Sequence, residues 1–178
     1  TVDLCRMHGT MPEDADQITL RTAGDFLDEE IAGELRQACP GADFSLNMVK
    51  SLKEKFAFVG EAQDPVVVEF PVKGKPTPFD ITEPLRRACR RMVPPMVEAL
   101  HQLIASFDPE FQDRLRNNVL LAGGGSQIRS LDREIENQMK ERMGGGRVFR
   151  IDDPIYSGAN GGLKIAHDMP KEYWQELR

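Results

Sequence analysis

The stretch LLAGGGSQIRSLD, Leu120 to Asp132, limits what the chain can fold into more than any other. An apolar run leads into three glycines and continues as a helical pattern, in which Ile128, Leu131 and Ile135 are spaced by three and four residues. Glycine is less stable than alanine by about 0.5–1 kcal/mol inside regular structure, so three in a row need a reason. The pattern predicts a buried strand, a glycine turn and a helix.

Two interpretations of the turn remain open on spacing alone. In open α/β sheets, ligands bind at the carboxyl ends of strands, so the bare backbone of Gly123, Gly124 and Gly125 could lie against a nucleotide. A tight strand–helix connection without a ligand would use the same residues. No lysine follows as in a Walker A loop, and GGGSQI does not match GxGxxG.

The remaining pattern predicts an α/β unit at the two ends of the chain with an α+β unit inserted between them. In chain order we predict strands at Val2–His8 and Gln17–Arg21, helices at 23–39 and 45–60 with Gly60 closing the second, and a hairpin at 66–81. Between Thr82 and Phe107 we predict two helices or one sharply broken helix, because Pro94 and Pro95 interrupt the helical pattern. A continuously buried strand at 117–122, the helix after the glycines, a strand at 147–151 and a helix at 159–169 follow.

Charge and cysteine usage exclude several classes of protein. A net charge of −6 favours neither nucleic acid nor an anionic membrane surface as a partner. The cluster at Arg86, Arg87, Arg90 and Arg91 is interpreted as the solvated face of a helix. Three scattered cysteines without CxxC spacing indicate reduced thiols in a cytoplasm and no zinc site. No apolar run of about 18 residues and no signal peptide is visible in this sequence.

Three charged residues invite a functional interpretation, but spacing does not require one. Lys53 flanks the apolar stripe of its predicted helix and Glu54 points away from it, so spacing alone places both on a solvated face. Asp3 is a carboxylate in a predicted strand, where acids are unfavourable; an edge position would also explain it.

Taken together, several segments resemble the actin superfamily, and the bacterial actins in particular. NNVLLAGGGSQIRSLD is similar to the family's adenosine motif, and TVDLC is similar to the end of its second phosphate loop, an Asp-x-Gly-x-Gly-Thr hairpin. KSLKEKF resembles the helix that borders adenine and ribose, AGDFLDEEI the glycine–acid turn before it, and DPIYSGANGGLKI the last connecting segment. Among bacterial actins, the chain is most similar to those that form filaments along magnetosome chains.

The resemblance implies an α/β, actin-like (ribonuclease H-like) ATPase lobe. Residues 1–23 and 91–165 would form subdomain IIA, and residues 24–90 would form the inserted α+β subdomain IIB. Residues 166–178 would be a C-terminal tail that returns toward the other lobe. Because TVDLC lacks the opening of its hairpin, we expect a fragment that holds the second half of the fold.

The resemblance also implies an ATP site in the cleft between the two lobes. Its nucleotide-binding residues would be Thr1 and Val2 near the β- and γ-phosphates, Gly24 under the sugar, Lys53 and Glu54 at the adenine and ribose, Gly123, Gly124 and Gly125 at the α-phosphate and ribose, and Ser126 beside them. Asp3 takes the place next to the family's water-orienting residue, so the resemblance implies that its carboxylate is the catalytic group that holds the attacking water in line. Phosphoryl transfer depends on such positioning and on charge neutralisation. Mg²⁺ is expected with ATP, but the family's usual aspartate for it is not in this sequence, so no residue is assigned to the metal.

The implied function is that of an ATP-hydrolysing bacterial actin that polymerises into cytoplasmic, cytoskeletal filaments, and hydrolysis by this chain alone is not expected. Its main partner would be itself, with magnetosome-associated adaptor proteins as further candidates and no direct membrane insertion. The faces around Met92–Met96 and the Glu61–Pro65 loop are candidate subunit contacts. Two alternatives stay open: a small-molecule kinase of the same superfamily and a non-catalytic scaffold.

Overall fold

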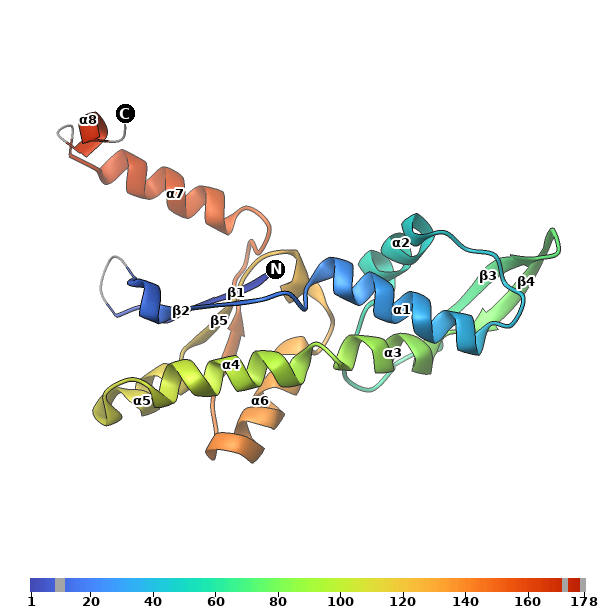
Figure 1. Cartoon of the computed structure of the whole chain (residues 1–178), viewed down its shortest axis with the longest axis horizontal. Coiled ribbons are helices and arrows are strands. Elements are labelled where there is room, and N and C mark those ends of the chain that lie inside the picture. Colours follow the sequence, from blue (N-terminus) through green and yellow to red (C-terminus); the bar gives the residue numbers. More distant parts are fainter. Residues whose placement is uncertain (9–11, 171–172, 177–178) are drawn as a thin grey trace.

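A computed structural model describes residues 1–8, 12–170 and 173–176, and its elements form two groups (Figure 1). The first group contains β1 (Val2–Cys5), β2 (Gln17–Leu20), α4 (Val93–Ala105), α5 (Pro109–Arg116), β5 (Val119–Leu121), α6 (Leu131–Met143) and β6 (Val148–Arg150). The second contains α1 (Gly24–Ala38), α2 (Leu46–Phe56), β3 (Val67–Val72), β4 (Lys75–Asp80) and α3 (Thr82–Arg90). Two short 3₁₀ helices, η1 (Asp14–Asp16) and η2 (Gly124–Gln127), complete the groups.

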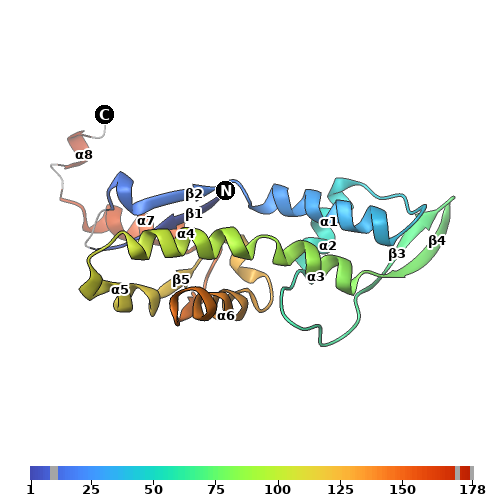
Figure 2. The same cartoon turned by 60° about the horizontal axis from the view of Figure 1, so that its bottom comes forward.

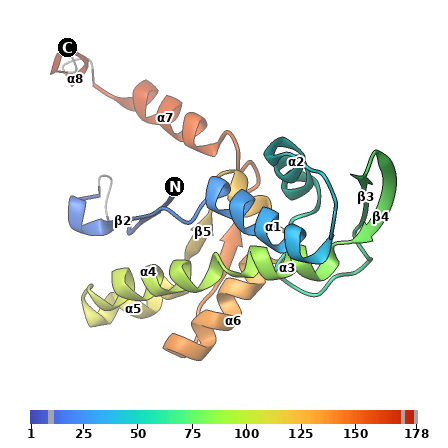
Figure 3. The same cartoon turned by 45° about the vertical axis from the view of Figure 1, so that its right-hand side comes forward.

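At the C-terminal end, α7 (Ser157–Asp168) and the short α8 (Tyr173–Glu176) extend away from both groups (Figures 1 and 3). None of the residues of α7 is buried. The predicted tail, residues 166–178, lies partly outside the described residues. The second group holds the elements predicted for the inserted unit, although the exact bounds of the two subdomains stay a prediction.

The strands form three separate two-stranded sheets. β1 and β2 are antiparallel, with Asp3 opposite Thr19, and β3 and β4 form the predicted antiparallel hairpin. β5 and β6 are parallel, with α6 between them in the chain. The first group is therefore mixed α/β, as the pattern predicted.

A helix junction joins the two groups (Figure 2). α3 ends at Arg90 and α4 begins at Val93, with its two prolines in the first turn. The first backbone N–H groups of a helix have no acceptor within it, so a proline loses no hydrogen bond there. The prediction of two helices is confirmed, but the break falls at Arg91 and Met92, and the two prolines lie inside the first turn of α4.

The core runs through both groups. On α1, Leu27, Ile31 and Leu35 recur every four residues and are almost fully buried, as an amphipathic helix requires. Their helix packs on α3, and α4 packs on α6 in the first group. Among the described residues the three cysteines are free, and burial raises the pKa of Cys89 to about 11.

Arg87, Arg90 and Arg91, at the end of α3, are exposed as predicted, but they also pair with acids of other helices. Arg87 and Arg91 both contact the carboxylate of Glu34 on α1, at 2.8 Å and 2.5 Å. Arg90 contacts Glu134 on α6, also at 2.8 Å. The arginine side chains are about half exposed, while the Glu34 side chain is 6% exposed. The Glu34 pairs lie within the second group, and the Arg90–Glu134 pair connects α3 to the first group. Helical spacing identified the polar face but not the acids opposite it.

The second helix ends earlier than predicted, at Phe56 and not at Gly60. The next residues turn to extended backbone because they pair with the loop before α6. Val59 N–H donates to the Arg129 carbonyl, and Arg129 N–H donates to the Ala57 carbonyl, both at 3.1 Å. This pairing fixes α2 beside the glycine turn.

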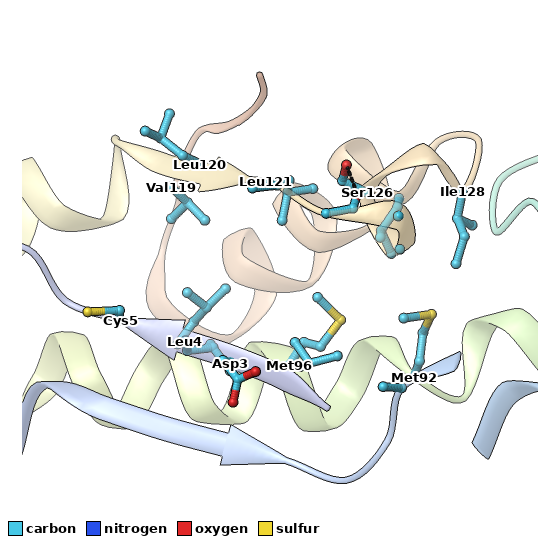
Figure 4. A pocket seen from close by; sticks show the side chains of 18 of the residues that line it. Asp3, Leu4, Cys5, Met92, Met96, Val119, Leu120, Leu121, Ser126 and Ile128 are labelled. Carbon is cyan, nitrogen blue, oxygen red and sulfur yellow. Dashed lines mark hydrogen bonds between the residues drawn. The ribbon is translucent and has the colours of Figure 1, made fainter. Parts of the chain in front are cut away.

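The prediction of a continuously buried strand was wrong at Leu120. Its side chain is 66% exposed, whereas those of Val119 and Leu121 are partly buried. Strand side chains alternate between two faces, and Figure 4 shows Val119 and Leu121 directed toward α4 and Leu120 directed away from it. Only one face of β5 is covered by the described residues.

No helix among the described residues is both long and apolar enough to cross a lipid bilayer.

Candidate functional site

A cavity of about 1700 Å³ lies between β1 on one side and β5 with the glycine turn on the other (Figure 4). The start of α1 and the end of α2 close one end of it, and apolar side chains of α4 form its floor. It is called the main cavity below. Every residue predicted for the nucleotide site lines it: Thr1, Val2, Asp3, Gly24, Lys53, Glu54, Gly123, Gly124, Gly125 and Ser126.

Four segments that are far apart in the sequence supply these residues, and each reaches the main cavity for a local reason. β1 lies at one wall because it pairs with β2, and Val2 is also packed against the core. The glycine turn follows β5 directly. Gly24 is the first residue of α1, and Lys53 and Glu54 are in the last turn of α2.

In the glycine turn, only Gly123 adopts a conformation that favours glycine. Its φ is +79°, and its N–H donates to the Pro154 carbonyl at 2.6 Å. Ser126 is 4% exposed, and its hydroxyl donates to the Gly123 carbonyl at 2.7 Å. The Ser126 hydroxyl therefore stabilises the turn, and its proton is directed to the backbone of the turn and not to a ligand.

Gly124 and Gly125 are different, because neither torsion nor packing requires glycine there. Both have φ outside the left-handed region, and a Cβ atom at either would meet nothing within 4 Å. Both are exposed and line the main cavity. The absence of side chains leaves bare backbone on the cavity wall, which is the surface that a close-lying ligand needs.

Asp3 is held by two hydroxyl groups. The Thr19 hydroxyl donates to Oδ1 at 2.7 Å, and the Thr1 hydroxyl donates to Oδ2 at 2.8 Å. These hydrogen bonds, that of Thr19 first, hold the pKa of the exposed Asp3 carboxyl below its usual value. The carboxylate is therefore ionised at neutral pH and can accept a hydrogen bond from water.

Lys53 is not a solvated residue, contrary to what spacing alone indicated. Its Nζ lies 2.7 Å from Oδ1 of Asp28 and donates to the Gly24 carbonyl at 3.0 Å. The side chains of Lys53 and Asp28 are each 14% exposed. Glu54 is exposed, as predicted, but on the side that faces the main cavity.

Sequence reasoning missed several residues of this site. Thr19 is opposite Asp3 in the β1–β2 register, which the strand pattern could have indicated once a hairpin was assumed. Asp28 follows Gly24 by four residues and so shares its helix face, which was a readable signal. Met92 and Met96, expected at an exposed contact face, are 3% and 6% exposed and belong to the cavity floor.

The described residues do not form a metal site. No group of three His, Cys, Asp or Glu side chains among them is placed to hold an ion. The predicted Mg²⁺ stays without an assigned residue.

Comparison with known proteins gives a consistent set of relatives, although no family model matches the chain. The actin-like protein MamK of Paramagnetospirillum magneticum is 35% identical over 177 residues, which are 99% of this chain and 51% of that protein. The MamK of Magnetospirillum gryphiswaldense is also 35% identical, over 99% of this chain and 49% of its own length. The chain thus spans about half the length of the curated relatives it matches.

A solved structure of a MamK double helical filament superposes with a TM-score of 0.90 at 34% identity. The superposition covers 94% of this chain and 51% of that one. The predicted actin-like α/β fold is therefore confirmed.

Proposed function

The chain belongs to the actin-like family, and on that premise we propose that it contributes one wall of the nucleotide site of a polymerising ATPase. The protein would be a bacterial actin that binds ATP with Mg²⁺, hydrolyses it, and forms cytoskeletal filaments in the cytoplasm. Binding of ATP would favour assembly, and hydrolysis would weaken the contacts between subunits.

One observation carries the proposal: ten residues predicted from four separate segments line a single cavity. Their arrangement suits a nucleotide, because Gly124 and Gly125 leave bare backbone on one wall and Asp3, whose carboxylate is ionised, is a residue of β1 on the other. The paired Lys53 lies at the end formed by α1 and α2. An ordinary strand–helix turn without a ligand would not need glycine at two positions of normal torsion and open surroundings.

Asp3 is the residue that we assign to catalysis. Hydrolysis of a γ-phosphate requires a water held in line for attack. An ionised carboxylate can accept a hydrogen bond from that water and so orient it. Thr1 and Thr19 fix both carboxylate oxygens, so the direction of the remaining lone pairs is set before the ligand enters. Mg²⁺ would neutralise phosphate charge when bound.

Self-association is supported by the relatives. One similar solved structure is that of a MamK double helical filament. Another is that of a non-polymerising MamK mutant bound to AMPPNP. It superposes with a TM-score of 0.86 at 35% identity, over 93% of this chain and 51% of that one. We propose filaments of the protein itself and, from the resemblance to magnetosome-chain actins, a role in organising such chains through adaptor proteins.

The test is ATP-dependent sedimentation with phosphate release, carried out on the full-length protein and on Asp3→Ala. The wild type is expected to pellet with ATP and release phosphate slowly. Asp3→Ala is expected to pellet and to lose most phosphate release. Absence of any ATP-dependent polymer would overturn the filament function.

The same experiment separates the two alternatives. A small-molecule kinase would transfer phosphate to a sugar or a carboxylate without forming a sedimentable polymer. A non-catalytic scaffold would show the same phosphate release, or none, in the wild type and in Asp3→Ala.

A further inference from the structure

The ammonium group of Lys53 is held by two oxygen atoms from the first turns of α1, and we propose that Asp28 is the positioning residue that makes this end of the main cavity suit the uncharged base and ribose of the nucleotide. The inference rests on the proposed function, and it assigns a role to a residue that does not itself line the main cavity among the described residues. Asp28 would act only through Lys53.

The geometry shows how the position of Lys53 is determined. Gly24 and Asp28 are four residues apart on α1, so the Gly24 carbonyl and the Asp28 carboxylate lie on one face of the helix. Lys53 reaches both from α2, at 3.0 Å and 2.7 Å. The Gly24 contact is a hydrogen bond, whereas the Asp28 contact is an ion pair whose geometry is not that of a hydrogen bond. An ammonium group has three donors, so an N–H remains for a ligand hydroxyl or ring nitrogen.

Charge decides which part of the nucleotide this end can accept. An unpaired Lys53 would be a strongly hydrated cation and would attract phosphate groups. The ion pair of Lys53 with Asp28 carries no net charge. Each side chain is 14% exposed, so solvent screens the pair only weakly. The pair therefore provides a fixed, neutral donor in place of a mobile cation.

Removal of the Asp28 charge should loosen Lys53 and leave its positive charge uncompensated. In Asp28→Asn the Gly24 carbonyl is the remaining fixed partner, so the side chain becomes free to turn toward solvent. We expect the affinity for ATP to fall about tenfold, the factor that corresponds to about 1.4 kcal/mol. Adenosine should lose the same factor, because the altered contacts are to the base and ribose that both molecules share.

Asp25 offers a matched control for the effect of charge on the helix. It lies in the first turn of α1, three residues before Asp28, is exposed, and has no ion-pair partner among the described residues. Asp25→Asn removes the same charge from the same helix end, where a carboxylate is favourable. It should leave the affinity for adenosine and for ATP within about twofold of the wild type, which isolates the contribution that passes through Lys53.

The measurement is competition of ATP and of adenosine against an ATP analogue labelled on its γ-phosphate, together with steady-state phosphate release, all on the full-length protein. Asp28→Asn should raise KM for ATP about tenfold with kcat within about twofold, because the reacting end is unchanged. Asp28→Glu should recover most of the affinity. Lys53→Met should weaken binding similarly, and the double variant should be no weaker than either single one.

The outcomes separate this inference from the proposed function. If the wild type binds no nucleotide, both are overturned. If the wild type binds ATP but Asp28→Asn leaves both affinities unchanged, or lowers kcat alone, only the role of Asp28 is overturned. If Asp28→Asn does not fold, Lys53→Met decides: an unchanged adenosine affinity overturns the proposal, and an equal loss for adenosine and ATP supports it.

Discussion

Replacement of Gly124 by alanine should separate stability from nucleotide binding. The torsions of Gly124 are open to any residue, and an added Cβ would meet nothing within 4 Å. Alanine restricts the unfolded chain more than glycine does, so folding should gain about 0.4–1 kcal/mol. For a domain of this size, such a gain raises Tm by about 1–4 °C.

Binding should change in the opposite direction. The methyl group would stand on the cavity wall against which we place the nucleotide, so the ligand would have to move away from the backbone. We expect ATP to bind at least about tenfold more weakly, which corresponds to about 1.4 kcal/mol. Thermal unfolding followed by circular dichroism gives the first quantity, and titration calorimetry with ATP gives the second.

Two other glycines provide controls. Gly33→Ala lies within α1 with nothing near its Cβ, so it should raise stability by about 1 kcal/mol and leave ATP binding unchanged. Gly123→Ala introduces a side chain at φ +79° and should lower stability by about 1–2 kcal/mol. If Gly124→Ala is more stable and still binds ATP as tightly as the wild type, the nucleotide does not lie on this wall.

Three further predictions concern the groups that support the site. Glu34→Gln should lower the unfolding free energy by about 1.5–3 kcal/mol, because the neutral amide removes the buried charge that both guanidinium groups pair with. Glu29→Gln on the exposed face of α1 should change it by less than about 0.5 kcal/mol, and chemical denaturation measures both. Thr19→Val should move the pKa of Asp3 upward toward its ordinary 3.8, which NMR titration of the carboxyl would detect. Because that pKa is lowered in the folded state, Asp3 stabilises the fold above about pH 4, and this stabilisation is lost as the pH falls through the folded pKa. Thr19→Val should therefore reduce the loss of stability on acidification. Ile31→Val, at a fully buried position, should cost about 0.5–1.5 kcal/mol in a thermal melt, and no change would mean that α1 does not pack as described.

The local order of elements was predictable because each element follows from its own residues. Apolar side chains every four residues set the buried face of α1, and the prolines set the break between α3 and α4. The glycine turn was also predictable as a connection. Its two competing interpretations were not separable from spacing, because a bare wall and a tight turn both use glycine. In the structure only Gly123 has a torsion that the turn requires, whereas Gly124 and Gly125 line the main cavity.

Partners across space were not predictable in the same way. Helical periodicity places Lys53 beside an apolar stripe, which is compatible with full solvation and with a buried ion pair. A solvated Lys53 and a paired Lys53 differ only in whether an acidic side chain lies opposite it, and that depends on how α2 packs against α1. The arginines of α3 show the same limit, since their acids come from α1 and α6.

The sequence also contained a signal for the ion pair of Lys53 with Asp28. Gly24 and Asp28 share a face of α1, and a carboxylate at the edge of a helix whose Leu27, Ile31 and Leu35 are buried needs a nearby cation. Lys53 is the cation that the structure brings to that face. A test of this reasoning by charge reversal is direct: Asp28→Lys should destabilise the fold by more than Asp28→Asn, and combination with Lys53→Glu should restore part of the loss. Additive losses in chemical denaturation would mean that the two side chains do not interact.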